Sequence, residues 1–200
     1  MSCTSKNFHP TLSPDLLGPD GRITTVPGIQ YVVVDPGIDL VGQPAGKATH
    51  LGGGAAQDWR LYKIQQPLRL LDAETGIYAD GWSKKTSSYS RYRTPGNRPG
   101  YVIVNVSRAA WNGTSPPGHV TIRVGPLRVK NKQPALASVT QTVRWTVQSG
   151  EQRTFQIATP KPPFRVEVLI SPTFVPAQQD PRSSDVREFG AQPSFGFRPR

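Results

Sequence analysis

The alternation of apolar and polar residues from Leu68 to the end of the chain is the feature that most restricts the fold. Apolar side chains occupy every second position in short segments, and turns containing Gly or Pro separate these segments. A period of two residues is that of a β-strand with one buried face. The strands predicted in this way lie near residues 68–70, 101–107, 119–124, 143–147, 155–157, 164–170 and 195–197. Seven or eight short strands at this spacing predict a mainly β protein, an antiparallel β-sandwich or jelly roll.

The chain divides by pattern into residues 1–66 and residues 67–200. The first part is rich in loops and contains two strand-like segments, 29–34 and 58–64, and the continuous apolar run of the first predicts burial on both faces. These two segments are expected to pair as an extended or α/β-remnant unit. The second part is predicted to be the sandwich, and its Ser149-Gly150 turn is expected to join 143–147 and 155–157 as a hairpin.

Charge is distributed unevenly along the chain. The net charge is +11, and no Asp or Glu occurs between Gly81 and Gly150, a stretch that contains eleven Lys and Arg. This stretch therefore lacks the carboxylates of acid–base catalysis and of hard-metal sites. A basic surface attracts phosphates of nucleic acid or of anionic lipids and lipid-linked sugars. The alternative is a surface that keeps the protein soluble and protects strand edges.

Cys3 is the only cysteine, so the chain forms no internal disulfide and no cysteine-based metal site. No apolar run is long enough to cross a membrane as a helix, and residues 1–10 lack the apolar centre of a signal peptide. The sequence as it stands is expected neither to anchor nor to export itself.

The segment from Tyr78 to Tyr92 has the composition of a binding site. An Asp80-Gly81 turn precedes Trp82, and aromatic and basic residues follow it. Exposed aromatic rings stack on sugar rings or on bases, and a carboxylate accepts hydrogen bonds from hydroxyl groups. The candidate ligand-binding residues here are Asp80, Trp82, Tyr89, Arg91 and Tyr92. The alternative is that Trp82 and Tyr92 belong to the core of the sandwich.

The segment from Asp180 to Glu188 alternates acidic and basic residues. Asp180 and Asp185 are weak candidates for calcium ligands, calcium being the only cofactor considered, and a surface network of ion pairs is the preferred alternative. The three histidines have no spacing typical of a zinc site, and no nucleophile, base and orienting group can be assembled. No catalytic residue is therefore predicted.

Several segments, taken together and in order, resemble the C-terminal extracytoplasmic region of large multi-pass actinobacterial membrane proteins of the glycosyltransferase type. The segments that carry this resemblance are GIQYVVVDPGIDLVG, DWRLYKIQQPLRL, TGIYADGWSKKTSSYSRYR, GHVTIRVGPL and PFRVEVLISPTFVPAQQDPRSSDVREFGAQPSFGF. In such proteins a membrane-embedded region is followed by a soluble region that ends in a jelly-roll-like sandwich. The resemblance implies that the catalytic carboxylates lie in membrane-proximal loops outside this chain, and it carries over Asp80, Gly81, Trp82 and Asp185 as ligand residues.

The function that follows is an expectation. The resemblance implies a non-catalytic, carbohydrate-binding-like accessory domain at the extracytoplasmic face of the cell membrane. Its partners would be a cell-wall glycan or lipid-linked sugar and the membrane-embedded part of a parent glycosyltransferase. A structural or assembly jelly roll and a basic polyanion-binding domain are the alternatives, and nucleic acid is the least expected partner because no known RNA- or DNA-binding pattern occurs.

Overall fold

The structure is a computed structural model, and strands make up most of the residues that it describes. The described residues are 18, 20–23, 31–34, 38–41, 46–52, 55–63, 68–108, 110, 116–130 and 133–200, with the main chain alone for 46–52 and 55–59. The described helical segments are the short η2 (Pro95–Asn97) and α1 (Pro176–Gln179). Neither of these two helices is long and apolar enough to cross a membrane.

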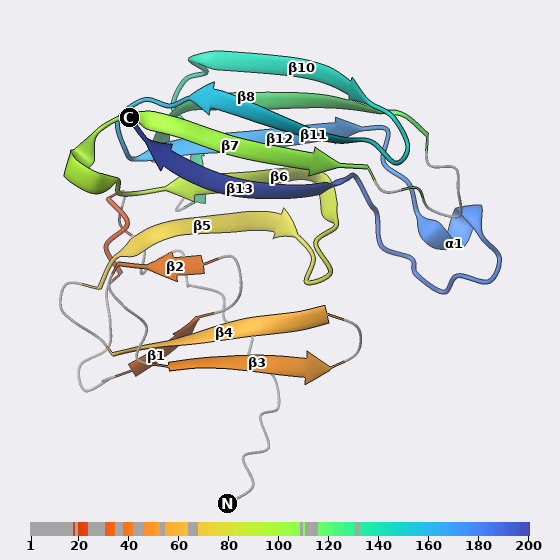
Figure 1. The fold of residues 1–200 in the computed structure, drawn as a ribbon, viewed down its shortest axis with the longest axis horizontal. Helices are drawn as coiled ribbons and strands as arrows, with labels where there is room; N and C mark the ends of the chain where they lie inside the picture. Colours follow the sequence, from red (N-terminus) through yellow and green to blue (C-terminus); the bar gives the residue numbers. More distant parts are fainter. Residues whose placement is uncertain are drawn as a thin grey trace, which may run out of the picture.

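Two antiparallel sheets of unequal size form a sandwich (Figure 1). The larger sheet has the order β10 (Gln141–Val147), β8 (Gly118–Lys130), β12 (Phe164–Ser171), β6 (Ser83–Arg91), β5 (Leu70–Ile77) and β2 (Ile38–Leu40), and β9 (Gln133–Leu136) pairs with the far end of β8. The smaller sheet has the order β11 (Gln152–Ala158), β7 (Gly100–Ser107) and β13 (Gln192–Pro199). The predicted mainly β antiparallel sandwich is confirmed, and a jelly-roll connectivity stays a prediction.

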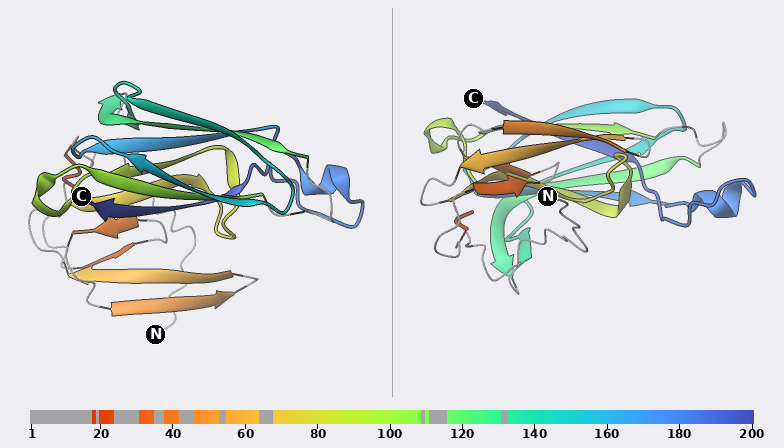
Figure 2. Two further views of the ribbon diagram at one scale, coloured as in Figure 1. Left: turned by 45° about the horizontal axis from the view of Figure 1, so that its top comes forward. Right: turned by 90° about the horizontal axis from the view of Figure 1, so that it is seen from below.

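A third, small sheet lies beside the β2 edge of the sandwich (Figures 1 and 2). It consists of β1 (Tyr31–Val34), β4 (Ala55–Lys63) and β3 (Gly46–Gly52). The predicted pairing of the first two N-terminal strand segments is confirmed, because β1 pairs with β4 antiparallel. The predicted burial of both faces of the first strand is wrong, since Tyr31 and Val33 are 48% and 49% exposed, whereas Val32 and Val34 on the other face pack into a core. Strand β2, which precedes residue 67, belongs to the larger sheet of the sandwich.

The core between the two sheets of the sandwich consists of the apolar residues that alternate with polar residues in the sequence. Inward-facing residues of β7, β8 and β12 are almost completely buried, and the outward-facing residues between them are mostly polar. Burying one such aliphatic side chain contributes about 1.5–3 kcal/mol to folding. The innermost residues are Val102, Val104, Val106, Val120, Ile122, Val124, Phe164, Val166, Val168 and Ile170.

The turn at Ser149 and Gly150 does not form the predicted hairpin. Strand β10 pairs with β8, whereas β11 pairs with β7 in the other sheet. The turn itself is regular, because the Glu151 carboxylate accepts a hydrogen bond from the Gln148 main-chain N–H at 2.8 Å. It carries the chain from one sheet to the other, and Trp145 and Arg153 then meet across the edge of the sandwich with the guanidinium 4.4 Å from the indole centroid.

A completely buried arginine, Arg108, connects the loops at one end of the sandwich. Its guanidinium donates hydrogen bonds to the main-chain carbonyls of Pro116 at 2.7 Å, Gly190 at 2.6 Å and Pro172 at 3.0 Å. It also lies 5.6 Å from the centroid of the Phe174 ring. Arg108 therefore ties the connection that follows β7 to the loops that follow β12 and precede β13.

Replacement of Arg108 by Lys is expected to destabilise the protein strongly. A lysine has no planar fork that reaches three carbonyls, so buried acceptors lose their donors, at about 1 kcal/mol or more for each bond. We expect the free energy of unfolding in urea to fall by about 3 kcal/mol. Arg182→Lys is the matched control, because the Arg182 side chain is 84% exposed and pairs only at the surface with Asp180. Equal effects of the two substitutions would contradict this role of Arg108.

Gly76 forms an irregularity in β5 that requires glycine. The pairing register of β5 with β6 shifts between Thr75 and Ile77, and Gly76 has φ of +76°. A Cβ atom at this position would collide with the main-chain carbonyl of Thr86. Gly150 has nearly the same φ, +77°, with no atom within 4 Å of the place a Cβ would occupy.

Replacing Gly76 and Gly150 by alanine, one at a time, distinguishes two sources of destabilisation, which are left-handed backbone strain and steric collision. Gly150→Ala adds the left-handed backbone strain alone, about 1 kcal/mol. Gly76→Ala adds the same strain and the collision with β6, so we expect it to lower the free energy of unfolding by at least about 2 kcal/mol more. Chemical denaturation of both variants measures the difference, and equal destabilisation would show that β6 yields to the added methyl group.

Candidate functional site

Trp82, the centre of the sequence-predicted site, is part of the protein interior. Its exposed fraction is 6%, and its indole ring stacks on Phe189 with centroids 4.8 Å apart and an angle of 5° between the planes. Phe174 packs against it edge-on at 5.5 Å. The Asp80-Gly81 turn forms as predicted, with Gly81 at φ of +86°, but it directs the indole inward. The prediction that Trp82 offers an exposed stacking surface is therefore wrong.

Tyr89 and Tyr92 are also buried, at 3% and 4% exposure, and they face different cores. Tyr89 lies in the core between the two large sheets, whereas Tyr92 packs in a second core with Leu68, Leu70 and Leu127. Burial raises the pKa of Tyr92 to about 12, and its hydroxyl has no hydrogen-bond partner among the described residues. The core alternative thus describes Tyr92 correctly, and no single exposed surface contains the three aromatic residues.

Arg187 brings Asp80 and Asp185 together. One guanidinium nitrogen donates to Asp80 Oδ2 at 2.7 Å and to Asp185 Oδ2 at 2.6 Å. The same guanidinium lies 5.0 Å from the Tyr78 ring centroid and 4.9 Å from that of Phe189. Its hydrogen bonds hold the pKa of Asp185 below the usual range. The two aspartates thus join the β5–β6 turn to the C-terminal loop.

The geometry gives no support to Asp180 and Asp185 as calcium ligands. Asp180 accepts hydrogen bonds from the main chain and the guanidinium of Arg182, and Asp185 pairs with Arg187. Across the described residues, no group of three or more Asp, Glu, His or Cys side chains is placed to hold a metal ion. The ion-pair alternative describes this loop.

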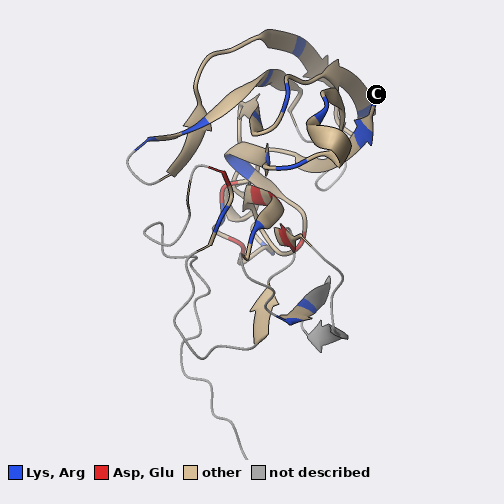
Figure 3. Ribbon diagram, turned by 90° about the vertical axis from the view of Figure 1, so that its left-hand side faces the viewer, with Lys and Arg blue, Asp and Glu red and all other residues tan. Residues whose placement is uncertain are grey.

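A polar cavity of about 320 Å³ lies where the larger sheet extends beyond the smaller one. Strand β11 lies against β10 and β13 lies against β6, so β5 and β2 project past the covered part of the sandwich. In the ribbon of Figure 3, the red segments of Asp and Glu lie mostly near the middle of the view, whereas the blue segments of Lys and Arg are spread over the described chain. The cavity is lined by Asp39, Arg60, Asp72, Glu74, Tyr89, Arg91 and residues 195–197 of β13. We refer to it as the edge pocket.

Three side chains form a hydrogen-bonded network in the edge pocket. Arg91 donates to Asp72 Oδ2 at 2.6 Å and to the Tyr89 hydroxyl oxygen at 2.9 Å, and the Tyr89 hydroxyl donates to the same Asp72 oxygen at 3.0 Å. The residues are cross-strand neighbours, because Asp72 pairs with Arg91 in the β5–β6 ladder. Desolvation raises the pKa of Asp72 in spite of the arginine, and it raises the pKa of Tyr89. The network is held rigidly by its mutual bonds.

Aromatic rings from β13 close one side of the edge pocket. Phe195 stacks on Tyr89 with centroids 5.4 Å apart and an angle of 9° between the planes. The guanidinium of Arg91 lies 4.5 Å from the centroid of Phe197. Opposite these rings, Asp39 of β2 forms an ion pair with Arg60 of β4. The small sheet thus contributes a charged side chain to the pocket.

Glu74 is the carboxylate of the edge pocket that has no partner among the described residues and can therefore bind a ligand. It lies two residues from Asp72 on the same face of β5, and no hydrogen bond or ion pair joins it to another described residue. Burial, together with the neighbouring Asp72, raises the pKa of Glu74 to about 7. A half-buried, unpaired carboxylate in a cavity is typical of a position that a ligand completes.

Of the predicted site residues, the edge pocket contains Tyr89 and Arg91. The sequence interpretation missed Asp72, Glu74, Asp39 and Arg60. One signal was present, because two carboxylates at positions i and i+2 of a strand point to the same side of the sheet. The contributions of β2 and β4 have no such local signal.

Glu74→Gln is expected to increase the free energy of unfolding at high pH, where Glu74 is charged in the wild type. Because the pKa of Glu74 is about 7 in the folded protein against 4.5 for a free side chain, the folded state binds this proton more tightly. The free energy of unfolding therefore falls as the pH rises from 4.5 through 7, by about 2–3 kcal/mol. In urea denaturation the Gln variant should gain stability relative to the wild type at pH 8 and much less at pH 5. Glu167→Gln, on the other face of the same sheet, is the matched control, and a gain for Glu74→Gln that is independent of pH would contradict the assignment.

Comparison with known proteins identifies no relative of this chain. No family model, curated protein or solved structure matches the chain. What the edge pocket binds must therefore be argued from its own side chains.

Proposed function

We propose that this chain is a non-catalytic, carbohydrate-binding-like β-sandwich and that the edge pocket is its sugar site. The observation that carries the proposal is the composition of this pocket, which combines carboxylates, guanidinium groups and aromatic rings around about 320 Å³. This volume lies at the lower end of the range for small-molecule sites, about 300–1,000 Å³. It is suited to one or two sugar rings rather than to a long chain.

The chemistry of the edge pocket matches that of a neutral sugar. A sugar hydroxyl both donates and accepts hydrogen bonds, so it needs acceptors and donors close together. Glu74 and Asp72 supply acceptors, and Arg91 and Arg60 supply donors. The rings of Phe195 and Phe197 offer apolar surface to the C–H faces of the sugar. Because opposite charges nearly balance in the pocket, a neutral ligand is favoured over a charged one.

The cellular context of the proposal rests on the sequence resemblance. A sandwich that holds glycan beside a membrane-embedded glycosyltransferase, at the extracytoplasmic face of the cell membrane, would keep the acceptor near the catalytic loops of that enzyme. The network of Arg91, Asp72 and Tyr89 supports a binding role, because its mutual hydrogen bonds fix the side chains before a ligand arrives. Cell-wall glycans and lipid-linked sugars are the ligand classes that follow.

The proposal predicts that neutral cell-wall oligosaccharides perturb the NMR signals of β5, β6 and β13. These shifts should persist at high salt, because hydrogen bonds to a neutral ligand are little screened. Glu74→Ala should weaken binding about tenfold or more, as expected for the loss of a charged hydrogen-bonding group. Glu167→Ala, which removes a carboxylate from the opposite face of the sheet, is the matched control and should bind as the wild type does.

Two results would overturn the proposal. One is the absence of shifts with every neutral oligosaccharide tested. The other is binding that Glu74→Ala leaves unchanged, because the ligand would then occupy another surface. The spectrum of each variant without ligand shows whether its fold is intact, so a folding defect is recognised before binding is interpreted.

A further inference from the structure

The exposed face of β8 and β10 carries a regular pattern of side chains. The antiparallel register places Thr142 opposite Arg123, Arg144 opposite Thr121 and Thr146 opposite His119. Each cross-strand pair thus joins one threonine to one arginine or histidine. The basic residue lies on β8 in the first and third pairs and on β10 in the second pair. We refer to these six residues as the Thr–Arg/His face.

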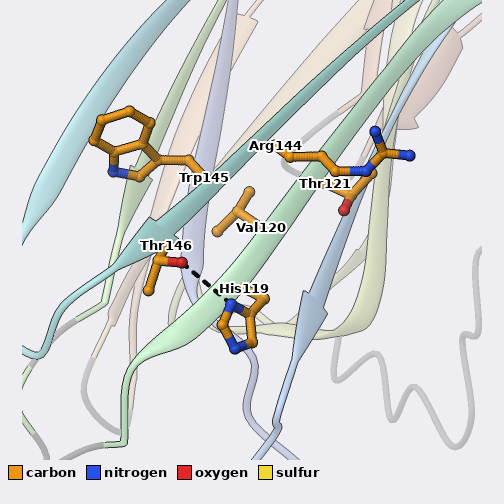
Figure 4. Close-up of a pocket in the computed structure, with 6 residues that line it drawn as sticks. All are labelled: His119, Val120, Thr121, Arg144, Trp145 and Thr146. Atoms are coloured by element: carbon orange, nitrogen blue, oxygen red, sulfur yellow. Dashed lines mark hydrogen bonds between the residues drawn. The ribbon is translucent and has the colours of Figure 1, made fainter.

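This face is open to solvent and hollowed. A cavity of about 610 Å³ is lined by His119, Thr121, Arg144 and Thr146, together with Val120 and Trp145. Figure 4 shows His119 and Thr146 side by side, joined by a hydrogen bond of 3.2 Å, while Arg144 extends along Thr121. Arg144, His119 and Thr146 are exposed. The donors of the face therefore point to water and are available to a ligand.

Positive charge on this face is not neutralised by its own strands. Strands β8 and β10 are described in full, and neither contains Asp or Glu. Two carboxylates lie nearby. Glu167 of β12 pairs in register with Arg123 and accepts a hydrogen bond from Arg165 at 3.2 Å, and Glu151, beside Trp145, accepts a hydrogen bond from Arg153 at 2.9 Å. Arg144 forms no ion pair with any described residue. Charge complementarity therefore favours an anionic ligand at Arg144 and His119.

We propose that the Thr–Arg/His face binds a linear acidic polysaccharide that carries a carboxylate on successive sugars. Side chains on one face of a strand repeat every two residues, about 7 Å. The three cross-strand pairs therefore place several basic groups and hydroxyl donors along the face, which suits a polymer with many anions rather than a single ion. The arginines donate to carboxylates, and the threonines donate to or accept from neighbouring hydroxyl groups.

The same face is poorly suited to nucleic acid. Single-stranded nucleic acid is held by several aromatic rings on which successive bases stack. His119 is the one aromatic residue among the six of the Thr–Arg/His face, and its ring is hydrogen-bonded to Thr146. Trp145 of β10 pairs in register with Val120 and also lines the cavity, but the guanidinium of Arg153 lies over its ring, 4.4 Å from the centroid. An acidic polysaccharide needs no stacking, so the observations favour it.

Binding of oligogalacturonate to the whole chain, measured by isothermal titration calorimetry, tests the proposal. The fully methyl-esterified oligomer of the same length is the control ligand, since it keeps the sugar and removes the charge. The wild type should bind the acid form and not the ester. Arg144→Gln should weaken binding about fivefold and reduce the salt dependence by about one counterion.

Arg128→Gln is the matched control variant. It removes the same charge from β8, the strand that pairs with β10, but Arg128 lies on the β8–β9 hairpin outside the face and is exposed. It should weaken binding less than about twofold. Equal weakening by both variants would overturn the proposal in favour of general electrostatic attraction. So would equal binding of the ester, or displacement of oligogalacturonate by oligothymidylate at lower concentration.

This site is independent of the edge pocket, and the two can fail separately. Glu74→Ala should leave oligogalacturonate binding unchanged, and Arg144→Gln should leave the NMR response to neutral oligosaccharides unchanged. Loss of both activities in either variant would contradict the assignment of two sites.

Discussion

The buried guanidinium of Arg108 is the interaction on which one end of the sandwich depends. Charges are rarely buried without a counter-ion, because desolvation costs several kcal/mol. Here three main-chain carbonyls and the face of Phe174 take the place of a carboxylate. The loops that supply these carbonyls lead into β8, away from β12 and into β13. Trp82, Phe174 and Phe189 then pack as a local core beneath them. The arginine therefore fixes the loop end in the way a metal ion does in other small domains.

The unequal width of the two sheets decides where a ligand site can form. Over most of the sandwich the sheets cover one another, and their inner faces carry valine and isoleucine. The smaller sheet does not extend over β5, and the inward-facing side chains of β5 there are Asp72 and Glu74. The inner face of a sheet thus continues from an apolar core into a polar pocket. Tyr89 belongs to both, because its ring packs in the core and its hydroxyl reaches Asp72.

The period-two pattern predicts the strands with apolar inward faces, and it fails where the inward face is polar. Strand β6, with the sequence SKKTSSYSR, has buried serines instead of apolar residues, so it resembles a loop. The hairpin prediction fails for another reason, since a Ser-Gly turn has the same local chemistry whether the next strand pairs or crosses to the other sheet. Trp82 is buried by Phe189, a contact between distant parts of the chain that no local pattern contains. For the same reason, Asp39 and Arg60 could not be assigned to the pocket from sequence.

The ion pair between Asp39 and Arg60 joins the small sheet to the larger one at the rim of the edge pocket. Because Arg60 also lines the pocket, the position of the small sheet and the occupancy of the pocket are thermodynamically coupled. A ligand that contacts Arg60 binds more tightly when the small sheet is in place, and it stabilises that arrangement by the same free energy. A filled pocket would in that way strengthen the attachment of the small sheet to the sandwich.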